Sequence, residues 1–160
     1  MHKLTAAAAV TAAASLGVMG IAYAASEDGN GAGGNRVLHL TVRQTQDAEI
    51  GTPNADSVLG LRFVGAHDVF DGARLVGHLG RSCEAVEDLD EEGLRSQCLF
   101  TLALEDGMIT AQALPTFTED GLSDFDAAVT GGTGAYRHAR GVVAVDPVTR
   151  TEARVTVDLR

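Results

Sequence analysis

The sequence predicts an all-β domain of about eight strands, folded as a barrel or a sandwich. After residue 35, apolar and polar residues alternate over short stretches, which is typical of strands with one buried face. Turn signals such as Asp106-Gly107 separate these stretches, and no stretch shows a convincing helical spacing of its apolar residues. Eight strands can close around a packed core or around one small ligand.

The last stretch, residues 150–159, alternates most clearly and predicts a strand with one apolar face. Residues 146–149 (DPVT) before it form a turn sequence, so 136–145 and 150–159 are expected to make the last hairpin. Gly77 and Gly80 interrupt another stretch and indicate bulges or sharp bends. The remaining expected strands cover 36–43, 58–64, 66–70, 74–86, 94–104, 108–114 and 122–130.

The first 24 residues are typical of a secretory signal peptide. Lys3 supplies the positive start, residues 4–21 are apolar and uncharged, and Ala22-Tyr23-Ala24 is a small-x-small cleavage sequence. The alternative is an uncleaved membrane anchor, but the Ala-rich stretch is at the short end for a span of ~20 residues. Residues 25–35 are small, polar and Gly-rich, which predicts a flexible tether before a single domain at 36–160.

Cleavage after Ala24 leaves 136 residues (160 − 24) in a secreted, extracellular protein. The only Lys leaves with the signal, so the net charge changes from −10 to 11 − 22 = −11. This acidic balance argues against nucleic acid and anionic lipid as partners, because both require basic surface. No later stretch is apolar enough to cross a membrane, so we expect no membrane partner after cleavage.

The two cysteines predict one disulfide. Cys83 and Cys98 flank an acidic run at 87–93, and their midpoint falls between Asp90 and Glu91. If that run is a hairpin loop, the cysteines lie opposite each other on adjacent strands, at a Cα spacing of ~5 Å that suits a bridge. The alternative is a redox or nucleophilic thiol, but neither cysteine has a CxxC partner or a nearby His.

One motif carries a family resemblance. Residues 131–141 (GGTGAYRHARG) resemble the GGTG-x-[FY]-x-x-A-R-G signature of dirigent proteins and of the related allene oxide cyclase barrel family. Three glycines allow a tight turn with positive φ between two strands. The order of residues 70–77 (FDGARLVG), a Cys-bearing strand and residues 106–109 (DGMI) is also similar, so the resemblance covers about residues 36–160.

The resemblance implies a fold and a mode of action. The fold is an eight-stranded antiparallel β-barrel, and the mode is binding of a small, mostly apolar or aromatic molecule whose cyclisation or isomerisation the cavity guides without a cofactor. The resemblance permits a homotrimer, whereas the strongly negative surface opposes association unless an apolar patch compensates. The alternative is a non-catalytic extracellular carrier or structural module with a packed barrel, so whether the protein is an enzyme stays open.

Candidate site residues come from two of the expected strands. Tyr136, His138 and Arg140 share one face; if that face lines the interior, Arg140 is a buried cation that binds an anionic group, while Tyr136 and His138 supply a proton donor and a base. The alternative is that this face points outward. The resemblance moves Arg140 towards the cavity, and a ligand-handling barrel requires a cavity of roughly 300 Å³ or more with at least one polar group inside.

The strand at 122–130 supplies the other candidates. Asp124 and Asp126 lie on one face and, inside a barrel, could act as an acid and a base; the alternative is the solvent face of the strand. Phe125 lies on the opposite, apolar face and is a candidate ligand contact. The scattered histidines lack metal-ligand spacing and no cofactor motif occurs, so neither a metal nor a cofactor is expected.

Overall fold

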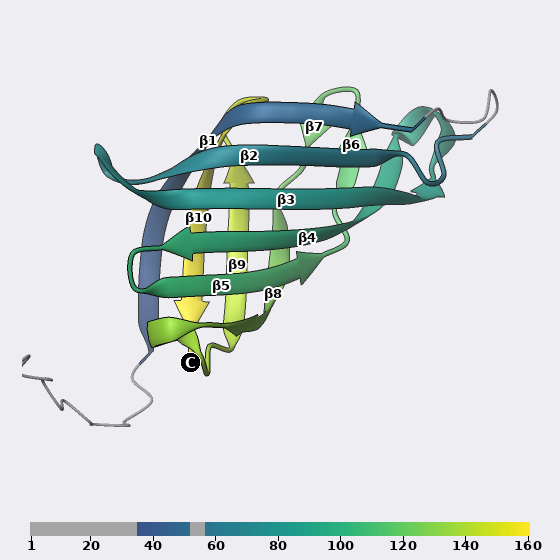
Figure 1. Ribbon diagram of the computed structural model, residues 1–160. Coiled ribbons are helices and arrows are strands. Elements are labelled where there is room, and N and C mark those ends of the chain that lie inside the picture. Colours follow the sequence, from purple (N-terminus) through teal and green to yellow (C-terminus); the bar gives the residue numbers. More distant parts are fainter. Residues whose placement is uncertain (1–34, 52–56) are drawn as a thin grey trace, which may run out of the picture. The chain divides into compact units, whose positions relative to one another are not determined.

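Eight strands close into an antiparallel β-barrel (Figure 1). The computed structural model describes residues 35–51 and 57–160. Around the barrel the strands follow the order β3-β2-β1-β10-β9-β8-β5-β4, and pairing of β3 with β4 completes the ring. The short strands β6 and β7 form a hairpin that pairs with the start of β4. The barrel expected from the sequence is therefore confirmed.

The elements follow the chain in hairpins, with two short 3₁₀ turns. They are β1 (Arg36–Ile50), β2 (Arg62–Asp71), β3 (Arg74–Asp88), η1 (Asp90–Glu92), β4 (Leu94–Leu104), β5 (Gly107–Ala113), β6 (Thr116–Thr118), β7 (Gly121–Leu122), β8 (Phe125–Gly132), η2 (Gly134–Tyr136), β9 (Gly141–Pro147) and β10 (Glu152–Leu159). In the described ranges, no helix is long and apolar enough to cross a membrane.

Strict alternation places one set of side chains inside the barrel. Val42 of β1 pairs with Ala153 of β10 on one side and with Val69 of β2 on the other, and all three belong to the apolar interior. Successive side chains of a strand point to opposite faces, so the pairing carries this interior face from strand to strand. The buried core is Leu40, Val42, Val69, Leu102, Ile109, Tyr136, Val155, Val157 and Leu159.

A bulge in β1 changes which residues face inward. The register of β1 against β2 shifts between Gln44 and Gln46, so Gln44 pairs with His67 and Asp47 pairs with Gly65. One extra residue reverses the alternation beyond it, which brings Asp47 onto the same face as Gln44. This bulge puts a carboxylate at one end of the interior.

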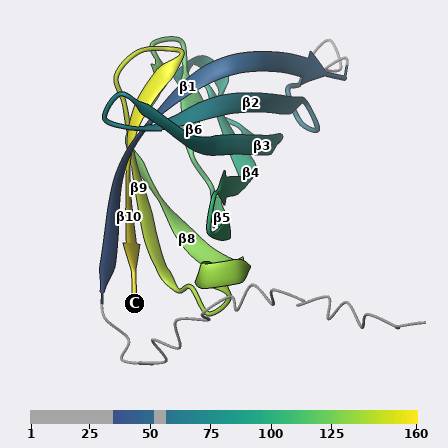
Figure 2. The ribbon, with the colours of Figure 1, turned by 60° about the vertical axis from the view of Figure 1, so that its left-hand side comes forward.

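The glycine-rich motif lies at the other end of the barrel (Figure 2). Its residues form η2 instead of a strand, and Tyr136 is 3% exposed within the core. The main chain of Thr133 and Ala135 donates to the carbonyls of Met108 and Asp106, at 2.8 Å each, in the β4–β5 hairpin. Gly134 has φ +59°, and a Cβ there would collide with the Asp106 carbonyl, which explains the glycine.

The disulfide joins β3 and β4 as predicted. Cys83 and Cys98 are direct cross-strand partners with a Cα–Cα distance of 4.1 Å. The acidic run between them is the hairpin end that carries η1. Both cysteines are almost fully buried, and Cys83 lies two residues beyond Arg81 on the same face of β3.

Several sequence expectations differ from the structure. The strand expected at 136–145 begins only at Gly141, because residues 134–136 form η2 and 137–138 continue the turn. Residues 58–61 precede β2 instead of belonging to it, and β8 begins at Phe125. Of the two glycines, Gly77 lies at a register shift, whereas Gly80 pairs regularly with Ala66. The signal peptide at 1–24 and all of the tether except Asn35 lie outside the described residues.

Candidate functional site

The barrel encloses a small apolar cavity, here called the bore. Its volume is about 100 Å³. All but two of its lining residues are apolar, and they come from both sides of the barrel: Leu40, Val42, Leu79, Phe100, Leu102, Ile109, Ala111, Leu122, Phe125, Ala127, Val143, Val145, Ala153 and Val155. Apolar walls with a few polar groups are typical of sites for small organic molecules.

The two polar lining residues are His67 and Arg81. They lie on the neighbouring strands β2 and β3, where His67 pairs with Leu79 and Arg81 pairs with Gly65. On one face of an antiparallel pair these positions are diagonal neighbours, which are within reach of long side chains. Both residues also line the wider opening described below, so they mark the polar end of the bore.

Arg81 forms an ion pair across an intervening strand. Its Nη2 donates to Oδ1 of Asp47 at 2.5 Å, although β2 lies between β1 and β3. Gly65, the residue of β2 between them, leaves the space for this contact: a Cβ there would lie 2.9 Å from Arg81 Nε and 3.1 Å from Asp47 Oδ1. The Arg81 side chain is 16% exposed, and its buried Nε has no hydrogen-bond partner.

His67 is buried and incompletely paired. The residue is 9% exposed, and its Nδ1 is buried without a hydrogen-bond partner. Burial is the main cause that lowers the pKa of His67 below its usual value of 6.5, and the Arg81 charge lowers it further. Two smaller effects raise this pKa: a hydrogen bond with the Leu79 backbone, and the negative charge of Asp47. A neutral imidazole at neutral pH follows, and a neutral imidazole can accept a proton.

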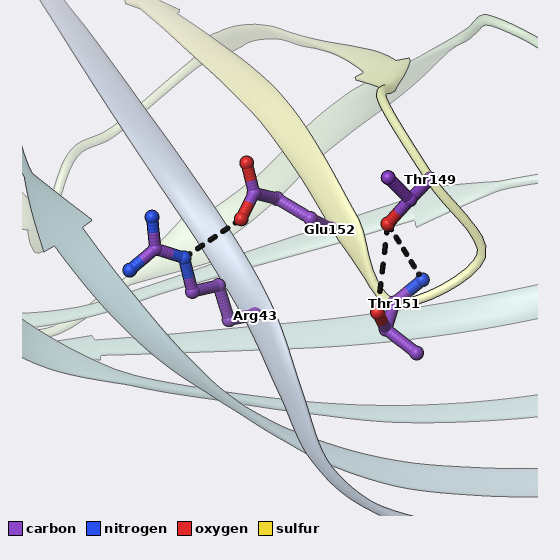
Figure 3. A network of polar contacts seen from close by, with 4 residues as sticks. All are labelled: Arg43, Thr149, Thr151 and Glu152. Atoms are coloured by element: carbon purple, nitrogen blue, oxygen red, sulfur yellow. Dashed lines mark hydrogen bonds and ion pairs between the residues drawn. The ribbon is translucent and has the colours of Figure 1, made fainter.

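The bore opens into a wide, half-polar mouth of about 690 Å³. Its rim is formed by the β9–β10 turn and the β6–β7 hairpin, which a hydrogen bond from Arg150 Nη2 to the Glu119 carbonyl joins at 2.9 Å. In the β9–β10 turn the backbone N–H of Thr151 donates to Thr149 Oγ1 at 3.2 Å (Figure 3). The enclosed bore is smaller than the roughly 300 Å³ expected of a ligand site, while the mouth exceeds it.

Glu152 of the rim is held by a residue of β1. Arg43 Nε donates to Glu152 Oε2 at 2.7 Å, and the two residues are cross-strand partners (Figure 3). The Arg43 guanidinium also lies 4.8 Å from the centre of the Phe70 ring. These contacts fix the Arg43 and Glu152 side chains at the edge of the mouth, which leaves Arg81 as the cation that lines the bore itself.

Of the residues proposed from the sequence, Phe125 lines the bore. Its ring stacks on that of Phe100, with 5.9 Å between ring centres. Asp124 and Asp126 are both exposed, and neither lines the bore or the mouth. The two carboxylates therefore lie on the solvent side, as the alternative interpretation had it.

His138 and Arg140 do not point into the barrel, which agrees with the outward alternative for this segment and not with the cavity position that the resemblance implies for Arg140. Both are exposed in the turn and loop that link η2 to β9, where strand alternation does not apply. The backbone carbonyl of Arg140 accepts a hydrogen bond from the Arg160 backbone N–H at 2.8 Å, at the end of the barrel away from the mouth. Tyr136 is buried, but it packs in the core beside the bore and does not line it. Arg140 lines neither the bore nor the mouth.

Sequence reasoning missed His67, Arg81 and Asp47. One signal was available: in the alternating stretch at 74–86, Arg81 shares a face with Leu79 and Cys83, and a lone charge on an apolar face indicates a functional or paired group. Asp47 could not be placed in this way, because the bulge that turns it inward leaves no signal in the periodicity. In the described part of the chain, no group of three or more potential ligand residues could hold a metal ion.

Comparison with known proteins gives one family and several structural relatives. The family model described as "Allene oxide cyclase barrel like domain" matches residues 39–159. No curated protein matches the sequence. Among solved structures, a pyocyanin demethylase is similar at 27% identity and a TM-score of 0.67, covering 78% of this chain and all of that one.

Two further structures share the fold at lower identity. The exo-specific intermolecular Diels-Alderase AbnU has 17% identity and a TM-score of 0.59, covering 79% of this chain and 98% of that one. The pterocarpan synthase dirigent protein GePTS1 has 19% identity and a TM-score of 0.57, covering 79% of this chain and 83% of that one. At these identities the likeness establishes the fold alone.

Proposed function

Because this chain belongs to the allene oxide cyclase barrel-like family, we propose that it binds a small, mostly apolar molecule, with the apolar part in the bore and the polar part at the mouth. The observation that carries the proposal is the bore itself: apolar walls end at His67 and Arg81, two polar residues that each keep a buried atom without a partner. Unpaired buried polar atoms are rare in folded proteins and call for an explanation, which a ligand would supply.

The chemistry that such a bore supports is confinement. Apolar walls hold a reactive molecule in one conformer, and a single polar end orients it, so a cyclisation or isomerisation needs no cofactor. The pyocyanin demethylase, at 27% identity, supports an aromatic molecule as the ligand class. We propose an exported protein as well, since the disulfide suits an oxidising compartment and residues 1–24 are typical of a signal peptide.

The second candidate is a carrier or structural module without catalytic activity, and one observation favours it. The enclosed bore, at about 100 Å³, holds less than most small-molecule sites of roughly 300 Å³ or more. In this case the interior side chains serve as a packed core, and any molecule bound at the mouth leaves unchanged.

Binding in the bore is tested with a matched pair of alanines on β8. Ala127 is buried and lines the bore, whereas Ala128 is exposed on the outer face. N-phenyl-1-naphthylamine, an uncharged dye that fluoresces in apolar surroundings, serves as the probe. We expect Ala127→Leu to weaken its binding about tenfold or more by filling the bore, and Ala128→Leu to leave it unchanged.

Equal binding by both variants would place the dye outside the bore and contradict the proposal. Native mass spectrometry of the protein isolated from its own host then separates the two candidates. A co-purifying molecule that the protein converts on incubation supports catalysis, and one that is released unchanged supports a carrier.

A further inference from the structure

The polar end of the bore specifies the chemical class of its ligand. We propose that the ligand carries an acidic hydroxyl group (a phenol, an enol or a carboxylic acid), that His67 takes its proton, and that Arg81 binds the resulting oxyanion. This inference rests on the proposed function, because it names the class of molecule that the same bore takes up.

Arg81 supplies donors that only an acceptor can satisfy. A guanidinium has five N–H groups and no acceptor atom. Asp47 accepts from Nη2, while Nε is buried with no partner. The other bore-lining residues except His67 are apolar and offer no side-chain acceptor. A ligand oxygen at this end therefore meets a fixed cation with unused donors, which favours a negatively charged oxygen over a neutral one.

His67 supplies the site for the proton. It is held neutral by burial and by the nearby Arg81 charge, and its Nδ1 has no partner. In the proposed step the ligand O–H bond breaks, its electron pair stays on the oxygen, and the proton bonds to Nδ1. The imidazolium that forms is attracted by the Asp47 carboxylate, and the oxyanion is attracted by Arg81. The two positive charges of His67 and Arg81 are then matched by the two negative charges of Asp47 and the ligand.

The neighbouring charges agree with this assignment. The acidic residues that line the mouth are Asp47, Asp120 and Glu152; Asp47 is paired with Arg81 and Glu152 with Arg43, and Arg150 lies on the same rim. A ligand without a polar oxygen would leave His67 Nδ1 and Arg81 Nε without hydrogen-bond partners. The apolar walls hold the rest of the molecule, so the ligand class combines an acidic hydroxyl with a small apolar or aromatic body.

The test compares two ligands that differ in one proton. The phenol 4-nitrophenol ionises to a yellow phenolate, whereas its methyl ether, 4-nitroanisole, cannot ionise. With the wild-type protein we expect 4-nitrophenol to bind about tenfold or more tightly than 4-nitroanisole. We also expect the bound phenol to show the phenolate spectrum at a pH where the free compound is still largely protonated.

Matched variants assign the effect to Arg81. Arg81→Met should remove both the preference and the spectral change, while Arg154→Met, which alters an exposed arginine paired with Asp146, should retain both. Gly65→Ala provides a second route, since it crowds Arg81 without deleting it, and should reduce the preference. Circular dichroism identifies any variant that does not fold.

The possible outcomes distinguish a failure of this inference from a failure of the proposed small-molecule binding. If both compounds bind equally to the wild type, or if Arg81→Met keeps the preference, the ligand class is wrong although the bore binds small molecules. If neither compound binds, and N-phenyl-1-naphthylamine does not bind either, the proposed function fails and this inference fails with it.

Discussion

Gly65 determines how the polar end of the bore is built. Asp47 and Arg81 lie on strands that flank β2, and their ion pair passes over the one position of β2 that has no side chain. Glycine is needed here for the space above its Cα, because a Cβ would lie 2.9 Å from Arg81 Nε. A single residue without a side chain thus positions two charges that belong to other strands.

A Gly65→Ala variant should therefore be less stable than the wild type. We expect a loss of about 1–3 kcal/mol in the free energy of unfolding, because the added methyl group crowds the ion pair. Gly80→Ala on β3 is the matched control, since a Cβ there meets nothing within 4 Å and its cost should be near zero. Urea unfolding measures both, and equal values for the two variants would contradict the role given to Gly65.

His67 should make stability depend on pH. Its pKa lies below 6.5 in the folded protein because of burial and the Arg81 charge, and near 6.5 in the unfolded chain. Between these values the unfolded chain binds more protons, so the contribution is complete above about pH 6.5 and declines as the pH falls towards the folded pKa.

Urea unfolding at about pH 8 and about pH 5 measures this dependence. His67→Gln should lose less stability between the two pH values than the wild type does. His138→Gln, which removes an exposed histidine, should behave like the wild type. A His67→Gln variant with the wild-type loss would show that other groups cause the pH dependence.

At the scale of elements, the disulfide cross-links the β3–β4 hairpin. Cys83 and Cys98 are 15 residues apart in the sequence and directly paired across the hairpin. Closing a loop of this size restricts the unfolded chain and stabilises the fold by about 3 kcal/mol on the chain-entropy description. Cys83 of the bridge lies on the same face of β3 as Arg81, two residues away.

Removal of the bridge should lower stability without changing the fold. A Cys83→Ala/Cys98→Ala double variant is expected to lose about 3 kcal/mol in the free energy of unfolding, measured by urea unfolding. The wild type under a thiol reductant provides the comparison without a mutation. Unchanged stability in both cases would show that the bridge does not restrict the unfolded chain.

Regular strands could be predicted from the sequence, and irregular segments could not. Alternation predicted the strand at 94–104 with the bounds that β4 has, and the acidic run placed the disulfide correctly. The stretch from Tyr136 to Arg140 also alternates, but hydrogen bonds to the β4–β5 hairpin hold it in η2 and a turn, so its pattern was misleading. The β1 bulge likewise depends on tertiary pairing that a local pattern does not contain.

At the scale of the whole molecule, strand counting alone left a barrel and a sandwich as alternatives. The resemblance at residues 131–141 selected the barrel, and the β3–β4 pairing confirmed it. The candidate site depends on this closure, because the residues that line the bore come from all eight barrel strands and from β7. No single stretch could therefore have indicated which residues meet at its polar end.

Export can be tested on the chain that includes residues 1–24. When the gene is expressed in a bacterium that secretes proteins, we expect cleavage after Ala24, so that the mature protein begins at Ala25. Intact-mass measurement of the exported fraction gives the cleavage position and also shows whether the two thiols are oxidised. A protein that keeps residues 1–24 and stays with the membrane would support the anchor alternative.

The position of η2 affects how a molecule can enter and leave the barrel. Tyr136 and the turn around it fill one end, while the described part of the chain leaves the other end wide open. The interior therefore has one opening, and a molecule that enters through the mouth must also leave through it. A molecule bound in the bore, as proposed above, would therefore have to leave through the mouth before a second molecule could enter.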